Sequence, residues 1–168
     1  MTPETSIDIV ALLEESRAGF EAAIEAVAPE RAGMKPEPEA WSVLEIIEHV
    51  TISERALLGQ LMRSEVAESG RRNPARESQV DTAIRNRAAK VEAPERARPA
   101  GRFETLDIAK RQYAAARAQT IQFACDRAAE LPRLSGQHMR FGPVNGVEML
   151  VIIASHSHRH AAQIRERV

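Results

Sequence analysis

Two histidines near the C-terminus have the spacing of a metal-chelating pair. His156 and His160 lie four residues apart within segment 149–165, where isoleucines recur at helical spacing. Residues i and i+4 of an α-helix lie on one face about one turn apart, so two such imidazoles can bind one divalent ion. A surface histidine cluster, or core histidines bonded to backbone carbonyls, would show the same pattern. His158 points away from the pair.

A third histidine, His49, lies next to the apolar face of a helix predicted to begin at the Ser42–Glu45 capping box. Taken alone, a histidine there indicates a core residue. If this helix neighbours the C-terminal helix, however, His49 can meet the pair. Three neutral nitrogen ligands leave a divalent ion charged and with an open position, as in catalytic zinc sites. Such an ion can acidify a water or thiol or polarise a substrate oxygen. Zinc, nickel and iron all accept imidazole.

Two residues near these histidines are weak catalytic candidates. Glu45 is a candidate fourth ligand or base, although its capping role already explains it, and Gln163 is a candidate for orienting a ligand or substrate. The zinc-peptidase motif, paired Glu-x-x-His motifs, a glycine-rich phosphate loop and a serine nucleophile elbow are all absent. Cys125 is expected to be a small buried hydrophobe, because nothing nearby in the sequence would lower its pKa.

The composition indicates a single cytoplasmic globular domain spanning residues 1–168. Hydrophobic residues make up 43 % and the formal net charge is −1, so no general footprint for nucleic acid or membrane binding appears. One cysteine excludes an intrachain disulfide and suits a reducing compartment. There is no signal-peptide pattern and no apolar run of membrane-spanning length.

The scarcity of aromatic residues and the wealth of Ala, Glu, Arg and Leu favour helices, and no segment alternates with period two. We expect an all-α four-helix bundle with a long crossover between helices 2 and 3. The expected elements are a helix capped by Thr2 with Pro3 and ending near Pro29, a second from Ser42 to about Leu61, a short crossover helix over 80–90, a third from Thr105 to Leu131, a loop over 138–146, and a fourth opened by Asn145 and Glu148.

The crossover over residues 64–101 is polar, and in its later part basic residues outnumber acidic ones. The simpler interpretation is a solvated connection between helices. The alternative is a rim that attracts anions.

Several segments together resemble the DinB-like family of metalloenzymes. The string Pro-Glu-Ala-Trp-Ser-Val-Leu-Glu-Ile-Ile-Glu-His over 38–49 resembles the family's helix-2 signature, and segment 100–106 is similar to the lead into its third helix. Phe-Gly-Pro-Val-Asn-Gly-Val-Glu-Met-Leu over 141–150, followed by the His-x-x-x-His-x-x-Gln-Ile pattern over 156–164, resembles its last helix. Where relatives often have His-Pro before that helix, this chain has His138 followed by Met139.

The resemblance implies a four-helix bundle that holds a divalent ion, zinc or nickel before iron, on His49, His156 and His160. Relatives include S-transferases and isomerases that use low-molecular-weight thiols, as well as metal-dependent hydrolases, and many are homodimers. We therefore expect a homodimeric, metal-dependent enzyme that activates a thiol or water for transfer to, or hydrolysis of, a small molecule, without nucleic-acid or membrane partners. The alternative is a non-catalytic bundle that binds metal or a ligand, or an interaction module.

Overall fold

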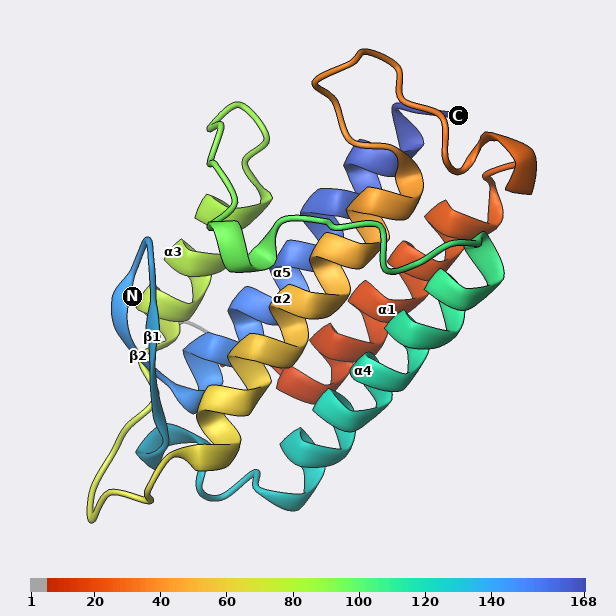
Figure 1. The fold of residues 1–168 in the computed structure, drawn as a ribbon. Coiled ribbons are helices and arrows are strands. Elements are labelled where there is room, and N and C mark those ends of the chain that lie inside the picture. The colour runs from red at the N-terminus through yellow and green to blue at the C-terminus, as the bar shows by residue number, and fades with distance from the viewer. Residues whose placement is uncertain (1–5) are drawn as a thin grey trace.

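The computed structural model describes residues 6–168, and these form a mostly helical fold (Figure 1). The helices are α1 (Ile9–Glu25), α2 (Val43–Arg63), α3 (Pro74–Arg85), α4 (Leu106–Asp126) and α5 (Gly146–Arg165), the short 3₁₀ turns are η1 (Pro29–Arg31), η2 (Glu95–Ala97) and η3 (Leu131–Arg133), and the strands are β1 (Ser135–His138) and β2 (Gly142–Asn145). The predicted bundle with a long crossover between its second and third helices is confirmed.

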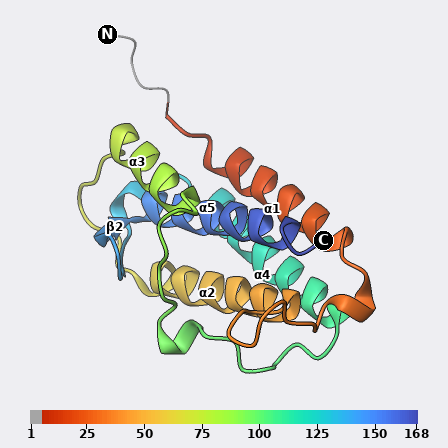
Figure 2. The same cartoon turned by 90° about the horizontal axis from the view of Figure 1, so that it is seen from above.

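Four helices make the bundle, and α3 packs outside it against α5 (Figure 2). Helices α1 and α2 each pack against both α4 and α5, which places α2 beside α5. Figures 1 and 2 show α1 running parallel to α5 and α2 running parallel to α4. Parallel neighbours need a connection that returns along the whole helix, about 30 Å for the 21 residues of α2. The crossover over 64–105 makes this return.

Helix α5 is the most deeply buried element. The run from Met149 to Ala154 is apolar on every side of the helix, and each of its residues is at most 2 % exposed. A helix that is apolar all round must be covered all round, and here α1, α2 and α3 cover it. The histidines follow this run, on the next turns of the same helix. Within residues 6–168, no helix combines the length and the hydropathy needed to cross a membrane.

A buried guanidinium joins all four bundle helices. Arg117 of α4 is fully buried and donates two hydrogen bonds to Glu54 of α2, at 2.8 and 2.9 Å. It also donates to the carbonyl of Leu13 at 3.0 Å and to Ser16 at 2.6 Å, both on α1. A further bond of 2.8 Å reaches Ser157 of α5, the residue that follows His156. This network sets the register between the two helices that carry the histidines.

Several predicted boundaries were wrong. Thr2 and Pro3 lie outside the described residues, and the first helix begins at Ile9 with Asp8 as its N-cap. The crossover helix spans Pro74–Arg85 rather than 80–90, because Asn73 caps it and Pro74 occupies its first turn. Helix α4 ends at Asp126, before the expected Leu131. Both capping boxes are confirmed, at Ser42–Glu45 and at Asn145–Glu148.

The predicted loop over 138–146 is instead mostly a hairpin, in which Ser135 pairs with Asn145 and His138 with Gly142. A three-residue turn followed by Gly142 at φ +67° closes it. Its strands of four residues are too short and polar for period-two alternation to reveal them. Cys125 is exposed, so its predicted burial was also wrong.

We predict that Arg117→Met lowers the free energy of unfolding by about 3–5 kcal/mol, because it leaves the buried Glu54 carboxylate without its partner. Urea unfolding followed by circular dichroism measures this. The matched control is Arg111→Met on the same helix, whose ion pair with Asp107 is exposed and should contribute little. Equal costs for the two variants would contradict the role assigned to Arg117.

Candidate metal centre

The structure brings His49 of α2 together with His156 and His160 of α5. The Nε2 atom of His156 lies 3.1 Å from Nε2 of His49 and 3.0 Å from Nε2 of His160. One ring nitrogen from each histidine lies within 4.8 Å of the others. The condition for convergence, that the two helices are neighbours, is therefore met, while metal binding by the three residues stays a prediction.

Hydrogen bonds to the outer ring nitrogens determine the tautomers. Nδ1 of His49 lies 2.7 Å from the carbonyl oxygen of Ala97, and because a carbonyl only accepts, this nitrogen carries the proton. Nδ1 of His160 lies 2.7 Å from Oε1 of Gln163 and donates in the same way. Both Nε2 atoms thus present lone pairs to His156. One proton on His156 cannot bridge both contacts well, whereas a divalent cation would satisfy all three nitrogens, so the donor set fits a metal ion.

The cluster is protected from water and electrically neutral. His49 is 6 % exposed and His160 7 %, and His156 is partly exposed as a whole residue. Burial lowers the pKa of His49, with a smaller opposing effect of its bond to Ala97. Burial and the neighbouring His49 lower the pKa of His160 to about 3. Burial and the other two histidines hold the pKa of His156 well below its usual value. Neutral imidazole is the form that binds metal.

A buried carboxylate that the sequence analysis did not single out supports His49. Glu48 is 1 % exposed and accepts hydrogen bonds from the backbone of Ala100 at 2.7 Å and of Arg102 at 3.0 Å. The Arg102 guanidinium also pairs with it. These bonds fasten the end of the crossover, drawn in green across α2 in Figure 1, and place the Ala97 carbonyl against His49. In the sequence, the one hint of this role was that Glu48 directly precedes the candidate ligand His49.

The ring of Trp41 packs against the histidine cluster. Its ring centroid lies 4.8 Å from that of His49. Trp41 is the chain's one tryptophan, so its fluorescence reports on the environment of His49.

The two catalytic candidates occupy different surroundings. Gln163 accepts the Nδ1 proton of His160 and so orients that ring from behind. Glu45 accepts a bond of 2.7 Å from the backbone of Ser42 and pairs with Lys35 at 3.0 Å. Both oxygens of Glu45 are therefore engaged at the helix start, and no described contact brings it to the histidines. His158 lies off the cluster, with a buried Nε2 that has no partner among residues 6–168.

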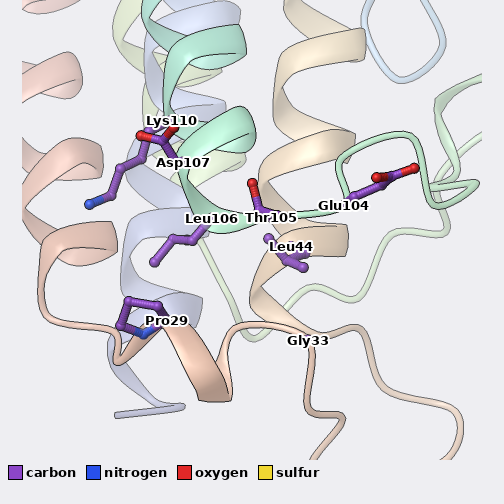
Figure 3. A pocket seen from close by; sticks show the side chains of 8 residues that line it. All are labelled: Pro29, Gly33, Leu44, Glu104, Thr105, Leu106, Asp107 and Lys110. Carbon is purple, nitrogen blue, oxygen red and sulfur yellow. The ribbon is translucent and has the colours of Figure 1, made fainter.

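Two surface cavities lie away from the histidines. One, of about 560 Å³, lies between the connection after α1 and the start of α4, with Leu44, Thr105 and Lys110 among its lining residues (Figure 3). The other, of about 730 Å³, lies by the hairpin and the start of α5. No histidine lines either of them.

Comparisons with known proteins agree with this fold. The model of the DinB superfamily matches residues 12–164. Among solved structures, the chain is similar to YfiT from Bacillus subtilis, described as a probable metal-dependent hydrolase with an unusual four-helix bundle topology. That likeness has a TM-score of 0.50 and 16 % identity, and it covers 99 % of this chain and 91 % of the other. No curated protein matches.

We predict that His156→Ala weakens Ni²⁺ binding by more than about 100-fold, because losing even an outer partner of a ligand typically costs about 10–100-fold. Quenching of Trp41 fluorescence during titration of the untagged, metal-free protein measures the affinity. His158→Ala is the matched control on the same helix and should bind like the wild type. A large loss in His158→Ala would show that the ligand assignment is wrong.

We also predict that the metal-free protein loses stability as the pH falls from about 6.5 towards about 3. In this window His160 takes up a proton in the unfolded chain but not in the folded chain. The contribution of His160 to the free energy of unfolding is therefore fully present above the ordinary histidine pKa and is lost as the pH falls. A histidine of this kind contributes a slope of up to about 1.4 kcal/mol per pH unit. Urea unfolding across this range should give a shallower slope for His160→Gln. Equal slopes for the two proteins would contradict the prediction.

Proposed function

The chain belongs to the DinB superfamily, and on that premise we propose that it is a metal-dependent enzyme whose divalent ion is held by His49, His156 and His160. The convergence of three neutral Nε2 atoms, two of them fixed as lone-pair donors by bonds at Nδ1, carries this proposal. Zinc and nickel are the preferred ions and iron the next, because all three accept imidazole ligands.

A divalent ion on three neutral ligands supplies Lewis acidity to a water, a thiol or a substrate oxygen. The protein's own residues prepare the place for it. Ala97 and Gln163 hold protons on the Nδ1 atoms of His49 and His160, which fixes the orientation of both rings. Trp41 packs on His49 and limits its hydration.

Two reaction types are consistent with this arrangement. The description of YfiT as a probable metal-dependent hydrolase favours water as the nucleophile. The family resemblance also supports transfer of a low-molecular-weight thiol to an electrophilic substrate. Apart from the three histidines, no His, Cys, Asp or Glu side chain joins the cluster among residues 6–168, so we propose that the ion activates the nucleophile. The non-catalytic alternative is a bundle that only binds metal or a ligand.

Reconstituted protein can test the proposal. We expect the metal-free chain to gain turnover when it is loaded with Zn²⁺, Ni²⁺ or Fe²⁺. Thiol transfer is assayed with a panel of thiols and a chromogenic electrophile, and hydrolysis is assayed with activated esters and amides. His158→Ala should keep this activity and His160→Ala should lose it. Rates that do not depend on the metal would contradict the proposal, whereas tight metal binding without turnover on any panel would favour the non-catalytic alternative.

A further inference from the structure

Three arginines gather where α3 ends beside α5. Arg159 donates to the carbonyls of Ile84 at 3.1 Å, Asn86 at 2.6 Å and Ala89 at 2.8 Å. The other two belong to different segments: Arg140 of the hairpin turn donates to the carbonyl of Ala83 at 3.1 Å, and Arg87 of the crossover pairs with Glu166 at 2.7 Å.

The positive charge of this cluster exceeds its compensation. Among residues 6–168, only Glu166 forms an ion pair with any of these three arginines. The carbonyl end of α3 contributes about half a negative charge in addition. More than one unit of positive charge is left. Consistent with this, the pKa of Arg159 is lowered by its burial and by the nearby Arg87 and Arg140.

Several other basic residues of the crossover are paired with acidic side chains. Arg72 pairs with the buried Glu77 at 2.6 Å, Arg85 pairs with Asp81 at 2.7 Å, and Arg102 pairs with Glu48. The anion-attracting rim considered for the crossover is thus strongest near Arg87, where arginines from the hairpin and from α5 join it.

The cluster adjoins the histidine site. Arg159 follows His156 by three residues and so lies on a neighbouring position of the same helix surface. The positive charge of Arg159 acts on both His156 and His160, that of Arg87 acts on His160, and His138 acts on His156. His156 is also the partly exposed residue of the three. A ligand at His156 is therefore within the field of these guanidinium groups.

We propose that Arg140 and Arg159, with Arg87 beside them, form an oxyanion-binding site next to the histidine cluster, where they hold a carboxylate or phosphate group of the small-molecule substrate. Guanidinium groups match both oxyanions through paired N–H donors. The hydrogen bonds to the end of α3 hold Arg140 and Arg159 in place before the ligand arrives. That the bound group belongs to a substrate rests on the proposed function, whereas anion binding by these arginines does not.

Isothermal titration of the full-length chain, metal-free and again after zinc loading, tests this proposal with succinate, inorganic phosphate and the neutral succinamide. We expect saturable binding of at least one anion, no binding of succinamide, and about tenfold weaker binding in Arg140→Gln. Arg140 is exposed, so this variant should fold. Arg140→Lys, which keeps the charge, should fall between the two. Tighter binding of succinate would indicate a carboxylate substrate, and tighter binding of phosphate would indicate a phosphate substrate.

The matched control is Arg133→Gln. This arginine also bonds a carbonyl, that of Ala67, but it lies in η3, which packs at the start of α5. Its loss should leave anion binding unchanged. The proposal is overturned if the wild type binds no anion, or if Arg133→Gln weakens anion binding as much as Arg140→Gln does. It is also overturned if succinamide binds as tightly as the anions. Anion binding that depends on Arg140 in a chain that binds no metal would sustain the oxyanion site while removing the proposed function.

Discussion

One buried side chain is bonded to each of the other three helices of the bundle. Arg117 has no exposure to solvent, and its partners lie on α1, α2 and α5. A buried guanidinium tolerates little displacement of these partners, because each lost bond leaves a buried charge unsatisfied. The bundle helices must therefore keep the register in which Ser157 and Glu54 both reach Arg117. In that register, His49 of α2 faces the histidines of α5.

The histidine site shows how tertiary contacts turn a sequence pattern into a chemical one. The Nδ1 proton of His49 is held by a carbonyl that arrives from the crossover, and Glu48 fastens the segment that follows that carbonyl. The proton of His160 is held within its own helix by Gln163. Half of the site is thus built locally and half depends on a segment about fifty residues away in sequence.

Local signals explain what could be predicted from the sequence. The capping boxes at Ser42 and Asn145 place the starts of α2 and α5, and the i, i+4 spacing identifies the pair on α5. The adjacency of α2 and α5 could only be stated as a condition, because it depends on packing across the bundle. The hairpin and the arginine cluster were beyond prediction for the same reason: each joins segments whose individual patterns are polar and weak.

The most direct test of the metal centre is the metal content of the protein as purified without an affinity tag, measured by inductively coupled plasma mass spectrometry. We predict about one equivalent of a divalent transition metal in the wild type. We also predict that His49→Ala and His160→Ala both lose this metal, because the site spans two helices. A wild-type protein that contains no metal even after loading with divalent ions would contradict the prediction and leave a bundle with core histidines.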